Sequence, residues 1–224
     1  MPGRPRLIAP NFPHHVVARA NRGDTVFHEN EDFLRFLQIM ATLKKRRNLK
    51  LWAFCLMSNH VHLLLVPYER DDLIKYMQGL LVSYTQYYND KYQIEGQLWK
   101  SKYFSSIVDH EKYLWQVLRY IERNPVRAGL TQNPEDYPFS SASKNGIRSH
   151  FLDPLPFTPE QSEIYKQWRS TPEPPELLEF LRKSIRKNWP IGERSFCEGL
   201  GYFKKRRGRP RKNGIRSYFS GHSV

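Results

Sequence analysis

The sequence has few cysteines, few acidic residues and no long apolar run. Only two of its 224 residues are cysteines, Cys55 and Cys197, which excludes the disulfide framework of a small secreted domain. No apolar run approaches the ~20 residues that a membrane-spanning helix needs, and the first fifteen residues lack the apolar segment of a signal peptide. We therefore expect a soluble, cytoplasmic protein that makes no use of a membrane.

Two nucleotide-related motifs are also missing. The chain contains no G-x-x-x-x-G-K-[ST] sequence, which excludes a P-loop ATPase or GTPase. It has no K/R-G-F-x-F stretch either, and such a stretch is typical of the RNA-binding strand of an RRM domain. An RRM-like RNA binder is therefore the weakest of the nucleic-acid readings considered below.

Acidic residues are outnumbered by basic ones. The 22 Asp and Glu against 36 Lys and Arg leave a formal net charge of +14. Most of the excess is in the last fifth of the chain, because residues 181–224 contain thirteen Lys or Arg and only two Glu. A basic tail on a folded domain indicates a polyanionic partner, most often nucleic acid, and the alternative is a tail that only adds solubility.

The first 130 residues contain alternating strand and helix patterns. Strands are predicted at residues 14–21, 49–57, 60–66 and 98–109, and helices at 30–48, 73–92 and 110–130. Ser58 and Asn59 can form the turn of a hairpin between the second and third strands. The order β-α-β-β-α-β-α predicts an α+β fold with a ferredoxin-like, RRM-like antiparallel sheet, packed helices and one extra helix.

The composition changes after about residue 145. We expect a folded domain over residues 1–145, a proline-rich connection with a short helical appendage over 146–200, and a basic, disordered tail over 201–224. The appendage contains an amphipathic helix at about 175–189. In the tail, "RGRPRK" resembles an AT-hook, in which proline keeps Arg209 and Arg211 extended for a narrow minor groove; a generic polybasic segment is the alternative.

Two histidines interrupt an otherwise apolar strand, "MSNHVHLLLV". Residues two apart in a strand point to the same face, so His60 and His62 present their imidazoles side by side. Two imidazoles that close form half of a metal site. The alternative is a pair of structural histidines at a strand end, and a third group is needed to decide between the two.

The helix at 110–130 offers such a group. Tyr120 lies away from the centre of its predicted buried face, and Asn124 lies four residues later on the same side. A phenol and an amide oxygen can serve as a nucleophile and a third metal ligand. Mixed nitrogen and oxygen ligands suit Mg²⁺ or Mn²⁺, without excluding Zn²⁺. The alternative is a boundary tyrosine followed by an ordinary helix-ending asparagine before Pro125.

Four sequence blocks over residues 11–145 carry a family resemblance: "MSNHVHLLLV", "LWKSKYFSSIVD", "YLWQVLRYIERNPVRAGL" and "YPFSSA". In this order they resemble the REP-associated tyrosine transposases, which belong to the single-tyrosine HUH nucleases. The resemblance implies that residues 1–145 form an HUH-type catalytic domain, with Tyr120 as the nucleophile and with His60, His62 and Asn124 as metal ligands.

The same resemblance implies an activity and a substrate. The chain would be a metal-dependent endonuclease and strand transferase that acts on single-stranded DNA, at hairpins of palindromic repeats, through a 5′-phosphotyrosine. Lys100 and Lys102 stand where the family pattern leads us to expect Gln and Arg, and Phe139 stands in place of a Trp, so the exact DNA target stays open. The rival function is a non-catalytic regulator that binds hairpin or AT-rich DNA.

Basic residues in four regions are candidates for contacts with DNA phosphates. They are Arg4, Arg6, Lys100, Lys102, Arg119, Arg123, Arg127, Lys204, Lys205, Arg206, Arg207, Arg209, Arg211 and Lys212. The three arginines of the helix could equally form a solvated face. The sequence leaves open whether the protein is a monomer or a homodimer, and a DNA partner would place it at the nucleoid.

Overall fold

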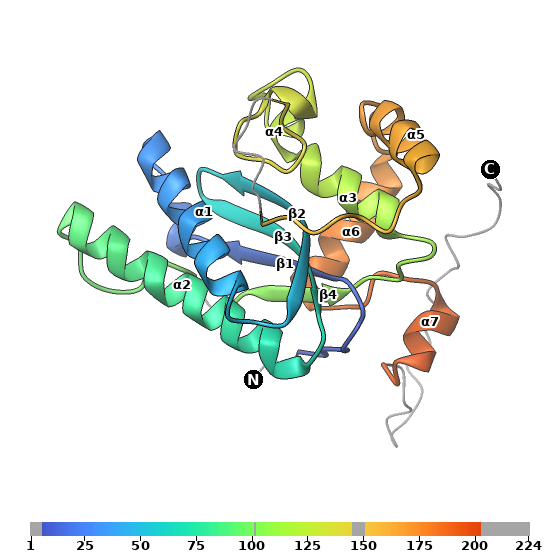
Figure 1. The fold of residues 1–224 in the computed structure, drawn as a ribbon, viewed down its shortest axis with the longest axis horizontal. Coiled ribbons are helices and arrows are strands. Elements are labelled where there is room, and N and C mark those ends of the chain that lie inside the picture. Colours follow the sequence, from blue (N-terminus) through green and yellow to red (C-terminus); the bar gives the residue numbers. More distant parts are fainter. Residues whose placement is uncertain (1–5, 101, 145–150, 203–224) are drawn as a thin grey trace.

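A four-stranded antiparallel sheet lies at the centre of the computed structural model, which describes residues 6–100, 102–144 and 151–202 (Figure 1). Its strands are β1 (His14–Arg19), β2 (Leu49–Met57), β3 (His60–Pro67) and β4 (Phe104–Ile107). They are arranged in the order β2-β3-β1-β4, with every neighbouring pair antiparallel. This confirms the α+β, ferredoxin-like prediction. The fourth strand is shorter than expected, because Trp99 forms only an isolated bridge with Ala20 before the chain reaches β4.

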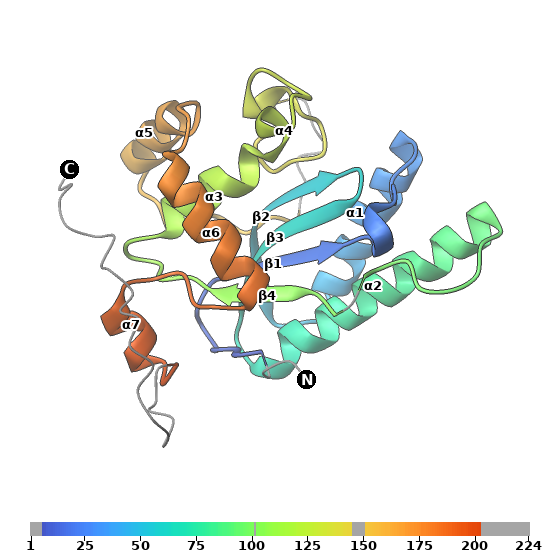
Figure 2. The ribbon, with the colours of Figure 1, turned by 180° about the vertical axis from the view of Figure 1, so that it is seen from behind.

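Two long helices cover one face of this sheet (Figures 1 and 2). They are α1 (Asn30–Lys44) and α2 (Arg70–Tyr92), which pack against each other. Both begin with a capping box, in which the side chain of the residue before the helix and that of its third residue cap each other's backbone N–H groups. The box formed by Glu69 and Asp72 explains why α2 starts a turn earlier than its apolar stripe predicted.

The other face is covered by α3 (Leu114–Glu122), α4 (Asn124–Arg127) and α6 (Pro175–Lys187). The single helix predicted at 110–130 is therefore two helices. The chain leaves helical geometry at Arg123, where φ is −89° and ψ is 5°. Pro125 explains the break, because it has no N–H to continue the helical hydrogen bonds.

The chain after residue 150 packs onto the same body. It contains α5 (Pro159–Arg169), α6 and α7 (Arg194–Gly199), and two short 3-10 turns occur earlier at Asn21–Gly23 and Pro134–Asp136. Leu181, Ile185 and Ile191 are buried in the main core, so the segment beyond the proposed boundary at residue 145 shares the core of the sheet. None of the helices in the described ranges is long and apolar enough to cross a lipid bilayer.

Candidate active site

The strand register places the two histidines on the face that α3 and α6 cover. His60 lies opposite Arg19 of β1, and His62 lies opposite Val17, so both histidines point the same way as their partners. Their ring centroids are 5.0 Å apart. The side-by-side arrangement expected from the H-x-H spacing is therefore present.

Both imidazoles have their Nδ1 engaged within the protein. Nδ1 of His60 is 2.6 Å from Oδ1 of Asn59, and Nδ1 of His62 is 2.8 Å from Nε2 of His15. These contacts leave Nε2 of His62 available to a ligand, whereas His60 also has a hydrogen bond with the side chain of Asn124. Burial lowers the pKa of His60 to about 4, helped by the charges of Arg19 and Arg127, and burial also holds the pKa of His62 well below its ordinary value. Both rings are therefore neutral at pH 7, as metal ligands must be.

The last turn of α3 brings Tyr120 to the histidines. Its ring meets those of His62 and His15 edge to face, with centroids 5.8 and 5.7 Å apart. Tyr120 is only 4% exposed, although the helix periodicity placed it off the buried face. Arg127 explains the difference, because its guanidinium covers the ring at 4.4 Å from the centroid. The helix periodicity describes α3 alone, so it could not show that Arg127 of α4 lies over the ring of Tyr120.

Asn124 begins α4 with its side chain directed back at α3. Its Nδ2 donates to the carbonyl oxygens of Tyr120, at 3.0 Å, and Ile121, at 3.2 Å. The amide hydrogens are thus occupied, and Oδ1 is the atom left to interact with His60, whose pKa the hydrogen bond with Asn124 partly restores. The two imidazoles and the amide of Asn124 therefore line the same part of the structure.

This donor set fits a hard or borderline divalent cation. Nitrogen and oxygen ligands suit Mg²⁺ or Mn²⁺, and three protein ligands leave positions for phosphate oxygens. Among the described residues, no cluster of three or more His, Cys, Asp or Glu side chains could hold a metal ion. A metal here would consequently depend on the amide of Asn124 in addition to the two histidines.

The four predicted residues open onto one hollow of about 500 Å³. Its wall also includes Arg127 and three arginines that the sequence reasoning did not single out: Arg19, Arg182 and Arg186. Arg127 is fixed by an ion pair with Glu173 and by a hydrogen bond to the Tyr120 carbonyl. His15 was likewise missed, and its place beside His62 follows from the pairing of β1 with β3, which no local pattern encodes.

Two expected DNA contacts are corrected by the structure. Arg119 and Arg123 are 3% and 6% exposed. Arg123 forms an ion pair with Glu173 at 3.0 Å, and the guanidinium of Arg119 lies 3.5 Å from the ring centroid of Trp168. The helix face looked solvated in the sequence because the segment that covers it comes some fifty residues later. In this arrangement neither side chain can reach a phosphate.

The other candidate DNA contacts differ in their surroundings, and most lie outside the described residues. Lys100 and Lys102 are exposed, and the backbone of Lys100 donates to the carbonyl of Arg19, beside the hollow. Arg6 lies 4.0 Å above the ring of Tyr103. The remaining candidates lie outside the described residues: Arg4, Lys204, Lys205, Arg206, Arg207, Arg209, Arg211 and Lys212.

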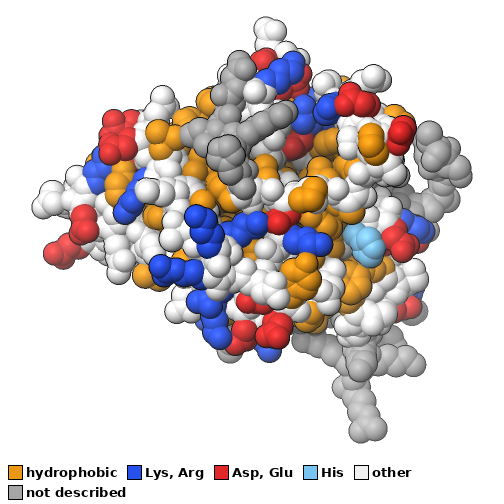
Figure 3. Space-filling view, in the orientation of Figure 1, with side chains coloured by type: hydrophobic (Ala, Val, Ile, Leu, Met, Phe, Trp, Pro, Cys, Tyr) orange, Lys and Arg blue, Asp and Glu red, His pale blue; other side chains and the backbone are white. Residues whose placement is uncertain are grey.

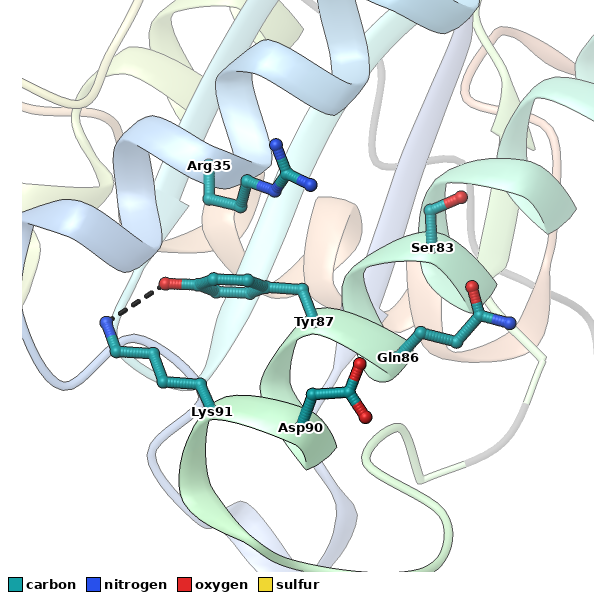
Figure 4. Close-up of a pocket in the computed structure, with 6 residues that line it drawn as sticks. All are labelled: Arg35, Ser83, Gln86, Tyr87, Asp90 and Lys91. Atoms are coloured by element: carbon teal, nitrogen blue, oxygen red, sulfur yellow. Dashed lines mark hydrogen bonds between the residues drawn. The ribbon is translucent and has the colours of Figure 1, made fainter.

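A second hollow, of about 520 Å³, lies between α1 and α2 on the opposite face of the sheet (Figure 4). Arg35 lines it from α1, and Tyr87 and Lys91 line it from α2. Figure 4 shows Lys91 reaching Tyr87, and Lys91 also forms ion pairs with Glu29, Glu31 and Asp32. These groups satisfy one another, so we assign this hollow to the packing of the two helices.

Comparison with known proteins identifies relatives of the chain. A family model described as "Transposase IS200 like" matches residues 9–124, just over half of the sequence. A Haemophilus influenzae protein named as a REP-associated tyrosine transposase is 28% identical over 102 residues, which are 40% of this chain and 56% of that protein. The chain thus spans little more than half the length of this relative.

Two solved structures also match the chain. The structure of a REP-associated tyrosine transposase bound to a REP hairpin matches with a TM-score of 0.53 at 18% identity, covering 70% of this chain and 92% of that one. At this identity the match supports the shared fold. A structure described as a transposase from Deinococcus radiodurans is 20% identical and covers 55% of this chain and 96% of its own, with a TM-score of 0.36.

Proposed function

Because the chain belongs to the family of IS200-like transposases, we propose that it is a metal-dependent endonuclease and strand transferase that acts on single-stranded DNA at hairpins. One observation carries the proposal: Tyr120, two neutral imidazoles and the Asn124 amide line the same hollow. The hairpin as substrate is supported by the solved relative, which is bound to a REP hairpin. The monomeric or dimeric state and the division at residue 145 stay predictions.

The proposed reaction is an attack by the Tyr120 hydroxyl on a phosphodiester. The bond from the tyrosine oxygen to phosphorus forms while the bond from phosphorus to the 3′ oxygen breaks, which leaves a 5′-phosphotyrosine and a free 3′-OH. When bound to His60, His62 and Asn124, Mg²⁺ or Mn²⁺ would polarise the phosphate and offset its developing charge. Arg127, which is held beside Tyr120 by Glu173, adds a fixed positive charge next to the reacting group.

The same intermediate permits joining. A phosphotyrosine retains the free energy of the broken bond, so the attack of a 3′-OH on it releases Tyr120 and reseals the strand. The absence of a P-loop motif agrees with a reaction that needs no ATP.

DNA hairpins labelled at one end or the other test this reaction. Hairpins from palindromic repeats near the gene would be labelled at either the 5′ or the 3′ end and incubated with the protein in Mn²⁺ or EDTA. In Mn²⁺, we expect the 3′-labelled piece to migrate with the protein on a denaturing gel and the 5′-labelled piece to run free. Intact DNA with a normal band shift in native gels, for several such hairpins, would instead favour the non-catalytic regulator.

Replacing His60 by Ala should separate catalysis from binding. The variant loses one of two imidazole ligands, so we expect Mn²⁺-dependent cleavage to fall at least ~100-fold, more than the loss of an outer partner causes. Hairpin affinity, measured in EDTA by fluorescence anisotropy, should change little, because most phosphate contacts come from basic residues. An equal loss of cleavage and affinity would refute this separation.

His15 should affect metal binding by fixing the tautomer of His62. Its Nε2 accepts from Nδ1–H of His62 when the metal occupies Nε2 of that ring, which fixes the tautomer that can bind a cation. We expect His15→Ala to weaken Mn²⁺ binding ~10- to 100-fold in titration calorimetry without DNA. His14→Ala is the control, because His14 is equally buried but contacts Phe12 and Ala9. Unchanged Mn²⁺ affinity in the folded His15 variant would contradict the role.

A further inference from the structure

Helix α6 brings two arginines to the hollow from a distant part of the sequence. Arg182 and Arg186 are exposed, four residues apart, and line the hollow together with Tyr120 and Asn124. Figure 2 shows α6 lying across the sheet beside α3. The position of these arginines therefore depends on how α6 is fixed to the sheet.

The opposite side of α6 is anchored. Leu181, Ser184 and Ile185 are buried, and the Ser184 carbonyl accepts a hydrogen bond from Ser106 Oγ of β4 at 3.3 Å. Asn188, which caps the helix, accepts from the backbone N–H of Ser105 at 2.8 Å. The helix is thus fixed at its centre and at its end, and its arginines are held at the hollow by the core.

The positive charges around the hollow are poorly compensated. Within the described part of the chain, no carboxylate lies at ion-pairing distance from Arg19, Arg182 or Arg186, and no acidic side chain lines the hollow. Arg127 is the exception, through Glu173. Burial lowers the pKa of Arg127, and the nearby charge of Arg182 lowers it further. Four guanidinium groups around one hollow repel one another unless an anion lies among them.

The size of the hollow restricts that anion. At about 500 Å³ it has the volume of a small-molecule site, which suits a few atoms of a single phosphodiester strand. Tyr120 lines the same hollow, so a strand that presents its phosphate to the hydroxyl lies close to the arginines. Arginine is suited to this contact because its planar guanidinium can bind phosphate oxygens in pairs.

We propose that α6 is a wall of the DNA site and that Arg182 and Arg186 bind phosphates of the single strand that leads to Tyr120. The inference rests on the proposed function, since it takes a single-stranded flank as the ligand. The segment after residue 145 would then take part in substrate binding as well as in the fold.

Salt-dependent binding tests the proposal. We would compare the parent Tyr120→Phe, which does not cut, with the same chain carrying Arg182→Gln and Arg186→Gln. The probe is a fluorescein-labelled repeat hairpin with a single-stranded flank of about ten nucleotides, a length within the range of single-strand sites. Each lost phosphate contact on a single strand should lower the slope of log K against log salt by ~0.7, so the slope should fall by about 1.4.

A charge-matched control is needed because basic residues occur elsewhere. Figure 3 shows Lys and Arg side chains gathered across the middle of the face seen in Figure 1. The control carries Lys183→Gln and Arg46→Gln, two exposed positions outside the hollow, one on α6 and one after α1. We expect it to keep the parent slope. The pair Arg182→Lys and Arg186→Lys should keep it too, because both charges remain.

Each result decides the question. A reduced slope with the flanked hairpin, absent with the same hairpin lacking its flank, supports the proposal. An unchanged slope, an equal reduction in the control, or an equal reduction with the trimmed hairpin overturns it. The adduct assay on the wild-type chain is independent: its failure refutes the proposed function, whereas unchanged slopes with an intact adduct refute only the role of α6.

Discussion

Replacing Tyr120 by Phe should eliminate the covalent protein–DNA adduct and reduce cleavage by at least ~10³-fold, because the attacking oxygen is lost. The substitution is conservative for the fold. Phenylalanine keeps the edge-to-face contacts with His15 and His62 and the ring that Arg127 covers. The change should therefore act on the chemistry and leave hairpin affinity and the unfolding temperature close to those of the wild type.

Tyr113 provides a matched control for this experiment. It immediately precedes α3, is 6% exposed, and lies outside the hollow. Tyr113→Phe should form the adduct at the wild-type rate, measured with the 3′-labelled hairpin in Mn²⁺. An adduct that persists in Tyr120→Phe, or that disappears only in Tyr113→Phe, would show that the nucleophile has been assigned to the wrong residue.

Replacing Asp32 by Asn should cost ~3–5 kcal/mol of unfolding free energy, the usual penalty for breaking a buried, hydrogen-bonded charge network. Asp32 is fully buried at the start of α1. Its carboxylate accepts hydrogen bonds from the hydroxyls of Tyr87 and Tyr92, at 2.9 and 2.7 Å, and from the ammonium of Lys91 at 2.9 Å. An amide would replace one acceptor oxygen with a donor that faces other donors.

The contribution of Asp32 to the free energy of unfolding should fall at low pH. Burial alone would raise its pKa, but hydrogen bonds from Tyr92, Lys91, the His28 backbone and Tyr87 lower it to about 2, from an ordinary value of 3.8. A lowered pKa means that the stabilisation is complete above pH ~4 and is lost as the pH falls toward 2. The unfolding free energy lost over this pH range is about 2 to 3 kcal/mol, since one pKa unit is worth ~1.4 kcal/mol.

Urea unfolding at several pH values measures this effect. The difference in unfolding free energy between the wild type and Asp32→Asn should narrow as the pH falls from 5 to 2. Asp71→Asn is the control, because Asp71 is exposed in the first turn of α2 and its ion pair with Lys75 is a surface pair. Equal effects of the two substitutions, or a difference that does not change with pH, would contradict the role of Asp32.

The local patterns of the chain were sufficient for the centre of the site. Strand alternation predicts that His60 and His62 share a face, and helix spacing predicts that Tyr120 and Asn124 share a side. Both predictions are confirmed in position, because these periodicities are properties of the backbone and do not depend on what packs against it. The catalytic and ligand roles of the four residues remain proposals.

Contacts between distant segments explain what the sequence could not predict. Arg119 and Arg123 were predicted to be accessible to DNA because the residues that cover them, Trp168 and Glu173, come about fifty residues later in the sequence. The interruption of the third helix was predicted beside Pro125, whose missing N–H is visible in the sequence, and it falls at Arg123. The pairing of His15 with His62 could not be predicted, because it depends on which strands become neighbours.

The sequence by itself determined the positions of the strands and of the two long helices, and the shared faces of His60 with His62 and of Tyr120 with Asn124, since these follow from local apolar patterns and from periods of two or 3.6 residues. Only the tertiary structure decided that α6 would border the hollow, that Glu173 would fix Arg127 beside Tyr120, and that His15 would lie at hydrogen-bonding distance from His62. The reason is physical: a periodic pattern specifies which side of an element is buried, whereas the partner it is buried against is selected by the packing of the whole chain.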